Sequence, residues 1–197
     1  MAIRYRLQYF GGRGASGLGG GTGGGGNFST YKNYDIERFG DQYTVLYQGD
    51  EVIVDSLKDA KKFIDDARVY EVYDEISNGA GSLKEIANYS DDMDIKAAKF
   101  TENGNSVKAQ RAILDNGTQR VDLWFSSDYN PLVNTGGSPK KAIETSITAR
   151  VWENDNFKGT RILTKTKSKS YKNAEKQYNE MLNEWKNVTG QKKITFS

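Results

Sequence analysis

The sequence predicts an α+β fold built of antiparallel β-hairpins that are each followed by an amphipathic helix. Short runs rich in β-branched and aromatic residues are separated by turns that contain Gly or Asn, a pattern typical of hairpins. Two longer segments place apolar residues at helical spacing, and they begin at Ser56 and Ser170. These observations favour one long helix packed on a sheet face in each half of the chain.

The first half is expected to contain one hairpin and one long helix. Strands are predicted at Tyr43–Tyr47 and Glu51–Asp55, because both runs are rich in β-branched and aromatic residues. Ser56, with an acid three residues later, is a capping-box variant that begins the helix, and the helical spacing ends at Asn78–Gly79. Residues 27–40 read as a polar, tyrosine-bearing lead-in to this hairpin.

The second half is expected to contain a short helix, several strands and the clearest helix of the chain. Ser82 opens the short helix with a capping box, and the acidic run Asp91–Asp94 ends it. Asp115–Gly117 indicates a hairpin, because Asn-Gly tolerates the positive φ of a type I′ turn. The last helix covers Ser170–Val188 and ends at Gly190. The remaining predicted segments are strands at Ile95–Thr101, Val107–Leu114, Thr118–Phe125, Thr145–Glu153 and Gly159–Thr166, and a proline loop at Asn130–Lys141.

The two long helices share a local pattern. Ser, Lys, Ala and Lys recur at a constant offset in Ser56–Ile64 and Ser170–Tyr178, and each segment follows a hairpin. The pattern has two interpretations. One is an internal repeat of two ββα-like units, and the other is the likeness of any two capped amphipathic helices that follow a hairpin.

A glycine-rich segment separates the first ten residues from the rest of the chain. Eleven of the sixteen residues in Gly11–Gly26 are glycine, a composition typical of a flexible tether. The predicted organisation has four parts: a basic aromatic head at 1–10, a Gly-rich N-terminal linker at 11–26, a small ββα domain at 27–90, and an antiparallel sheet with a long C-terminal helix at 91–197.

The composition excludes several kinds of chemistry. The chain contains no Cys and no His, so a Ser-His-Asp unit, a Cys-His unit, a thiolate metal site and an imidazole metal site are all excluded. We therefore expect that the protein is not an enzyme and that it binds neither a metal nor a cofactor. The formal net charge is +2, so nucleic-acid binding would need a local basic patch. No apolar run is long enough for a membrane span, and Met1–Phe10 is not followed by the apolar region of a signal peptide.

Three aspartates near the middle of the chain are candidate ligands for a hard cation. Asp91, Asp92 and Asp94 offer carboxylate oxygens, which Ca²⁺ and Mg²⁺ prefer. The spacing is not that of an EF-hand loop, because Gly at the sixth position and Glu at the twelfth are both missing. A solvated acidic loop after the short helix is the favoured interpretation.

Lysines alternate with Thr or Ser near the end of the last predicted hairpin. In a strand, this spacing places Lys165, Lys167 and Lys169 on one face. The basic ridge continues onto the helix as far as Lys176, and its candidate binding residues are Lys158, Arg161, Lys165, Lys167, Lys169 and Lys172. One interpretation is contact with nucleic acid or an acidic partner. The other, which is favoured, is an edge strand that its lysines protect from aggregation.

Aromatic residues lie close to basic ones around the proline loop and the last hairpin. Such residues can stack the bases of a single-stranded nucleic acid. Core packing under the long helix is the favoured interpretation for the whole group, which consists of Trp124, Phe125, Tyr129, Trp152 and Phe157.

A nine-residue element near the N-terminus carries a resemblance. Tyr9–Gly17 reads Tyr-Phe-Gly-Gly-Arg-Gly-Ala-Ser-Gly. It resembles an aromatic-Gly-Gly-Arg-Gly-Ala-Ser element found near the ends of minor structural and head-morphogenesis proteins of phages that infect Gram-positive bacteria. The resemblance implies a phage or prophage origin and a virion or assembly context. The element includes no catalytic residue. Because the sequence predicts neither a membrane span nor a signal peptide, we expect the protein in the virion or in the cytoplasm of the infected host cell.

Together, these observations predict a non-catalytic, phage-encoded binding or assembly protein that acts through protein–protein contacts. The head is expected to dock on a phage structural protein or a host complex, as an added strand, and the linker raises its local concentration. The docking residues are expected to be Tyr5, Leu7, Tyr9, Phe10 and Arg13. The alternative is a nucleic-acid-associated module, or a phage inhibitor of a host defence nuclease (anti-CRISPR-like), that acts through the basic ridge.

Overall fold

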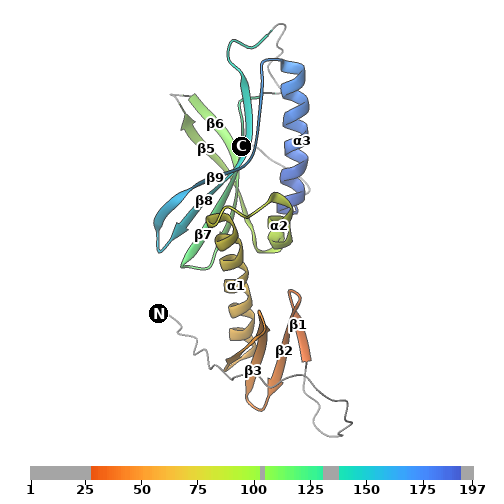
Figure 1. The fold of residues 1–197 in the computed structure, drawn as a ribbon, viewed down its shortest axis with the longest axis vertical. Helices are drawn as coiled ribbons and strands as arrows, with labels where there is room; N and C mark the ends of the chain where they lie inside the picture. Colours follow the sequence, from red (N-terminus) through yellow and green to blue (C-terminus); the bar gives the residue numbers. More distant parts are fainter. Residues whose placement is uncertain (1–27, 103–104, 131–137, 192–197) are drawn as a thin grey trace. The chain divides into compact units, whose positions relative to one another are not determined.

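The computed structural model describes residues 28–102, 105–130 and 138–191, and this part of the chain is α+β, with two antiparallel sheets and three α-helices (Figure 1). The chain divides into two compact units, Met1–Asp65 and Asp66–Ser197. The two predicted domains, 27–90 and 91–197, meet at a different point of the chain from these two units. The predicted division stays a prediction. The predicted head and Gly-rich linker lie outside the described residues.

The first unit contains a four-stranded meander, with the strand order β1-β2-β3-β4. β3 and β4 are the predicted hairpin, whereas β1 and β2 occupy the segment that the sequence analysis read as a polar lead-in. The prediction of a polar lead-in is wrong because charged residues alternate with Tyr34 and Ile36 along β2, so that Ile36 is buried and Tyr34 half-buried on one face. The strands are β1 (Phe28–Tyr31), β2 (Tyr34–Phe39), β3 (Gln42–Tyr47) and β4 (Asp50–Val54).

The first part of helix α1 (Leu57–Ser77) covers one face of this sheet. The predicted cap is present, because the Asp59 amide donates to Ser56 Oγ at 3.1 Å and the Ser56 hydroxyl donates to the Asp59 carboxylate at 2.6 Å. The small core consists of Ile36, Val45, Val52, Val54, Ala60 and Ile64. The helix ends at the predicted Asn78–Gly79 pair, where Gly79 has φ 75°.

The second unit contains a five-stranded meander, the remainder of α1 and the helices that follow it. Its sheet has the order β5-β6-β7-β8-β9, so each strand pairs with its neighbour in sequence. Ser82 and Glu85 form the predicted capping box at α2. The elements are α2 (Leu83–Ile86), a 3₁₀ helix (Ala87–Asp92), β5 (Asp94–Glu102), β6 (Asn105–Asp115), β7 (Gln119–Ser127), β8 (Ile143–Glu153), β9 (Asn156–Ser168) and α3 (Tyr171–Thr189).

The turn between β6 and β7 differs from the prediction. Three residues connect the strands, and of these only Gly117 has a positive φ, of 85°. A type I′ turn would need positive φ at two consecutive central residues. Asn116 instead caps the turn with its side chain, because Asn116 Oδ1 accepts from the amides of Thr118 and Gln119.

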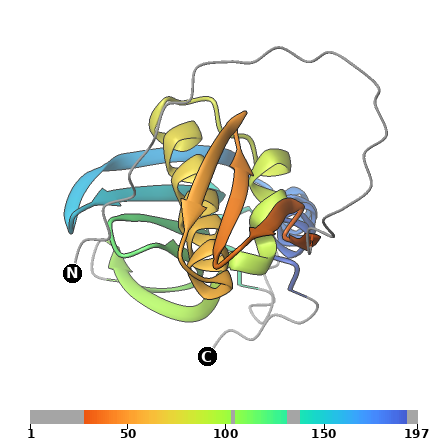
Figure 2. The same cartoon turned by 90° about the horizontal axis from the view of Figure 1, so that it is seen from below.

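One face of the five-stranded sheet is covered by α3, as Figures 1 and 2 show. Burial alternates along β8, so that Ile147, Ala149 and Val151 face the core. Trp185 of α3 is fully buried, and its Nε1 donates to Gln110 Oε1 at 2.8 Å. α3 ends at Gly190, as predicted, with φ 66°. We call the opposite face of this sheet the outer face.

Both meanders end on a hairpin that leads into a helix. The number of strands differs between the two, so the repeat of two ββα-like units stays a prediction. No helix within the described part of the chain is long and apolar enough to cross a membrane.

Candidate functional site

The outer face of the five-stranded sheet carries arginine and tryptophan side chains on three adjacent strands. The register places Arg111 of β6 opposite Trp124 of β7, and it places Arg120 of β7 opposite Trp152 of β8. Cross-strand partners on one face lie about 5 Å apart, so these pairs are in contact range. Because Ala112, Leu123 and Ala149 face the core, alternation turns these arginines and tryptophans outward.

The guanidinium groups lie over the indole rings. Arg111 Cζ is 4.8 Å and Arg150 Cζ is 4.6 Å from the centroid of the Trp124 ring. Since β6 and β8 flank β7, Trp124 receives one arginine from each side. Arg120 Cζ lies 4.7 Å from the centroid of the Trp152 ring. Cation–π contacts of this kind strengthen as the groups lose water, and Trp124 is only 9% exposed.

A buried carboxylate lies among these arginines. Asp122 is 3% exposed, its Oδ2 pairs with Arg111 Nη2 at 2.5 Å, and its Oδ1 lies 3.6 Å from Arg120 Nε. No carboxylate within the described residues lies in ion-pair distance of Arg150. This cluster therefore contains three arginines and one carboxylate, and it has an excess of positive charge.

Exposed apolar side chains border the arginine–tryptophan cluster. The Phe157 ring lies 5.0 Å from the Trp152 ring at an interplanar angle of 57°, and Phe157 is 53% exposed. Ile162, opposite Thr148, is 62% exposed. The outer face thus presents an accessible aromatic ring directly beside a guanidinium-stacked one.

The other end of the outer face is rich in lysine. Lys165 and Lys167 of β9 pair with the same carboxylate, that of Glu144, at 2.6 and 2.8 Å. These hydrogen bonds, first from Lys165 and then from Lys167, lower the pKa of Glu144 to about 2. The bond to Glu144 also raises the pKa of Lys167. One carboxylate serves two ammonium groups, so this end also has an excess of positive charge.

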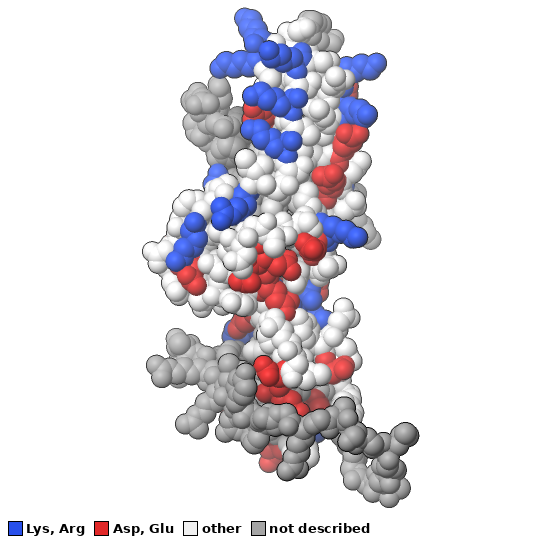
Figure 3. All heavy atoms as spheres, in the orientation of Figure 1, with Lys and Arg blue, Asp and Glu red and all other residues white. Residues whose placement is uncertain are grey.

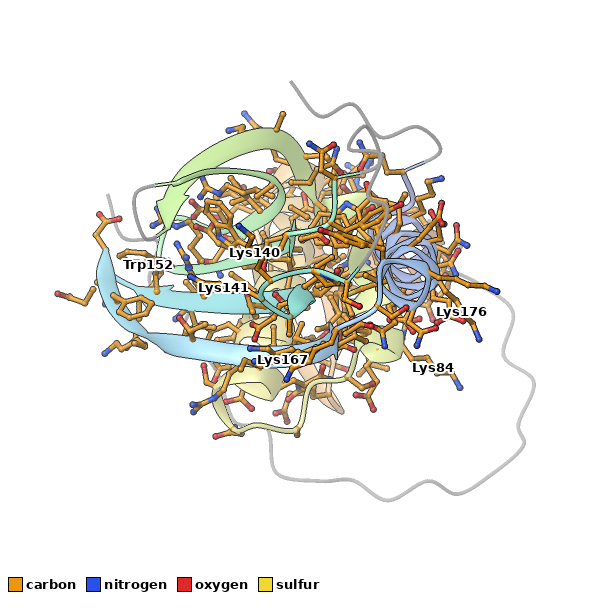
Figure 4. All side chains as sticks on the ribbon, turned by 90° about the horizontal axis from the view of Figure 1, so that it is seen from above. Lys84, Lys140, Lys141, Trp152, Lys167 and Lys176 are labelled. Carbon is orange, nitrogen blue, oxygen red and sulfur yellow. The ribbon has the colours of Figure 1, made fainter. Side chains whose placement is uncertain are left out.

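Further lysines lie at the same end of the sheet. β8 begins at Ile143, which lies opposite Ser168, the last residue of β9. Lys140 and Lys141 precede this point and Lys169 follows it, and all three are exposed. Figure 4 shows Lys140, Lys141 and Lys167 at this end of the sheet, and Figure 3 shows Lys and Arg side chains gathered over the same part of the unit.

The structure separates the members of the predicted basic ridge. Lys165 and Lys167 share the outer face, as their spacing predicts. Arg161 lies opposite Ala149 on the inner face and donates to the carbonyl of Ser77 at 3.2 Å. Lys158 pairs with Glu153 at 3.0 Å, at the other end of the hairpin, and this contact raises its pKa. Lys169 and Lys172 lie where β9 leads into α3.

The predicted aromatic group is also divided between the two faces. Phe125 and Tyr129 pack under α3, with ring centroids 5.9 and 5.3 Å from that of Tyr178. The favoured interpretation is therefore correct for these two residues. It is wrong for Trp124, Trp152 and Phe157, which lie on the outer face and have no part in the core under α3.

The three aspartates that are candidate cation ligands are paired with basic side chains. Arg68, 7% exposed, donates to Asp91 at 2.8 Å and to Asp92 at 2.7 Å. Asp94 pairs with Lys96 at 2.8 Å. Within the described ranges, no group of three His, Cys, Asp or Glu side chains is placed to hold a metal ion.

The expected docking residues Tyr5, Leu7, Tyr9, Phe10 and Arg13 lie outside the described residues. Sequence reasoning missed the three arginines and Asp122. The signal that could have found them is the spacing of charged and aromatic residues two positions apart along the predicted strands, since such residues share one face. This spacing occurs in Arg120-Val-Asp-Leu-Trp124 and in Arg150-Val-Trp152.

Comparison with known proteins gave no match: no protein-family model fits the chain, and no curated protein or solved structure is similar to it. The function is therefore argued from the geometry of the outer face.

Proposed function

We propose that this chain is a non-catalytic binding protein that engages a polyanionic partner, with nucleic acid as the ligand class, through the outer face of its five-stranded sheet. The observation that carries the proposal is the excess of basic groups over carboxylates on that face. The basic residues are Lys96, Arg111, Arg120, Arg150, Lys165 and Lys167, and the acidic ones are Asp94, Asp115, Asp122 and Glu144.

The local charge supports this proposal because the chain as a whole is close to neutral, with a net charge of +2. A cationic surface releases counterions from a nucleic acid when it binds the phosphates, and this release makes the affinity depend on salt. Two uncompensated basic groups correspond to a logarithmic salt slope of about −2. The absence of His and Cys from the sequence supports a binding role over a catalytic one.

The test is fluorescence anisotropy with labelled nucleic acid over about 50 to 200 mM salt, a range in which phosphate contacts are strongly weakened. The variant K165E/K167E reverses two charges on the outer face and should lower the affinity at least about tenfold. The control K58E/K84E makes the same change in net charge at two exposed lysines on α1 and α2. Binding that is indifferent to salt, or equal losses in both variants, would contradict the proposal.

A second candidate function is a role in phage assembly, and the resemblance of Tyr9–Gly17 favours it. In this proposal, the head docks on a protein partner as an added strand, and the linker supplies reach. Deletion of residues 1–17 should abolish capture of virion proteins from infected cells and leave the thermal midpoint nearly unchanged. Capture that is lost on nuclease treatment would instead favour the nucleic-acid proposal.

A further inference from the structure

The outer face contains arginine side chains that have aromatic partners but few acceptors. Within the described residues, the guanidinium groups of Arg120 and Arg150 donate no hydrogen bond, although both residues are partly buried against tryptophan rings. A guanidinium has five N–H donors in a fixed planar arrangement, and a partly buried one gains from a bound oxyanion. The terminal N–H groups of these two arginines are therefore the donors left for an external phosphate, because Arg120 Nε is buried and lies 3.6 Å from Asp122 Oδ1.

Trp124 positions the guanidinium groups of Arg111 and Arg150. Arg111 and Arg150 both lie over its ring, from strands on either side. With Trp124 only 9% exposed, its ring is not a surface for a ligand base, and its contribution is to hold two cationic groups in place. The Phe157 ring is different, because it is 53% exposed and lies next to Trp152, whose ring carries Arg120.

We infer that the ligand of the outer face is a single-stranded nucleic acid, with bases stacked at Phe157 and the edge of Trp152, and phosphates bound by Arg120 and Arg150. The inference rests on the proposed function and specifies its ligand. Every base presents a π-face that an aromatic side chain can stack on, whereas an acidic protein surface offers carboxylates without such faces.

The exposed ring also distinguishes a single strand from a duplex. In a double helix the bases are stacked on one another, so an exposed phenylalanine on a sheet face gains little from them. Positions two residues apart on one strand of the sheet are about 7 Å apart, and neighbouring strands are about 4.8 Å apart. Rings and guanidiniums therefore alternate over short distances, as bases and phosphates do along a single strand.

The test compares the full chain's affinity for oligothymidylate of about 12 nucleotides, a duplex of equal length, and heparin as a polyanion without bases. Phe157→Ala should weaken binding of the single strand at least about fivefold, since one stacked base contributes about 1 to 3 kcal/mol. The same change should leave the affinity for the duplex and for heparin within about twofold, because phosphate contacts remain.

The matched control is Phe39→Ala, which removes an 82% exposed ring from the sheet of the other unit and should leave all three affinities unchanged. Arg150→Gln is a second variant, and it should lower the affinity for all three ligands. Because Phe157 and Phe39 are both exposed, neither substitution should change stability. Thermal midpoints equal to that of the unsubstituted chain show that both alanine variants fold.

The outcomes separate the inference from the proposed function. No salt-dependent binding of any of the three ligands would overturn both. Salt-dependent binding in which oligothymidylate, duplex and heparin respond equally to Phe157→Ala would overturn the inference alone. A loss confined to the single strand, absent in Phe39→Ala, supports the inference.

Discussion

The two sheets share one construction and differ in their outer faces. Each is an antiparallel meander with one face against helices. On the four-stranded sheet, the outer face carries exposed apolar side chains (Phe28, Phe39, Leu46 and Ile53) beside the carboxylates of Asp35, Glu37 and Glu51. On the five-stranded sheet, the outer face carries arginines stacked on tryptophans and a buried aspartate. Within the described residues, the stacked arginines and the buried carboxylate belong to the outer face of the five-stranded sheet, which is the reason for placing the candidate site there.

The cores of the two units differ as well. Among the described residues, six buried ones form the core against the four-stranded sheet, and sixteen form the core against the five-stranded sheet. Hydrophobic stabilisation scales with the apolar area removed from water. We therefore expect the larger core to make the five-stranded unit the more stable of the two.

The largest expected effect is that of Trp185→Ala in the five-stranded unit. The substitution removes a fully buried indole and leaves Gln110 without its hydrogen-bond donor, so the free energy of unfolding should fall by about 3 to 5 kcal/mol. Urea denaturation measures the loss, and hydrogen exchange locates it. Amides of β5–β9 should lose protection while those of β1–β4 keep theirs, and an equal loss in both sheets would refute independent cores.

The reciprocal change is Ile64→Ala, in the core of the four-stranded unit. Ile64 is fully buried, so the loss should be about 2 to 4 kcal/mol and fall on β1–β4. In this smaller core, such a loss should produce a separate, earlier transition in the urea curve. Leu57→Ala, at a 36% exposed position on the same helix, is the control and should cost much less. A single unchanged transition in the Ile64 variant would contradict the expected difference in stability.

A smaller effect is expected from Ser82→Ala at the start of α2. The serine hydroxyl accepts from the Glu85 amide, and the Glu85 carboxylate accepts from the Ser82 amide. The bonds from Ser82 lower the pKa of Glu85. Loss of the cap should cost about 1 kcal/mol, measured by urea denaturation. Ser29→Ala, on β1 outside any helix cap, should have little effect.

The smallest expected effect is that of Glu144→Gln on the outer face, and it has two parts. At pH 7 the change frees Lys165 and Lys167, so affinity for a polyanion should rise about two- to fivefold. The pKa of Glu144 is lowered to about 2, so its ion pairs stabilise the fold above pH 4.5, and this contribution disappears as the pH falls through 2. The carboxyl is one-third exposed, so the stability difference should be small.

The pH part of this prediction is checked by urea midpoints at pH 7, 4 and 2.5. The wild type should lose more of its stability than Glu144→Gln on acidification, so the two midpoints should converge at low pH. A midpoint difference that does not change with pH would show that the depressed pKa has no role in stability. An unchanged or weakened polyanion affinity would argue against the lysine end as part of the site.

The sequence predicted the helices well because their signals are local. The serine caps, the apolar spacing of period 3.6 and the terminal glycines all lie within a few residues of each other, and the helix bounds agree with them to within a residue or two. The predicted hairpin of β3 and β4 was also local. The sequence did not predict β1 and β2, because only two of the six residues of β2 face the core. These two residues are Tyr34 and Ile36.

The outer face could not be predicted in the same way, because its contacts join residues on different strands. Arg111 and Arg150 reach Trp124 only through the register of β6, β7 and β8. A shift by one residue would turn every one of these side chains to the other face. The sequence showed basic and aromatic residues near one another, but which of them share a face follows from that register.

The meander order of both sheets has a kinetic consequence. Every strand pairs with the strand that precedes or follows it in the chain. Most pairings therefore close only a short loop and cost little chain entropy, and the longest connection, between β7 and β8, covers residues 128–142. Folding rates increase as contacts become more local. During synthesis, the four-stranded sheet can complete its pairing before the five-stranded one has left the ribosome, and each unit can fold without waiting for a distant partner strand.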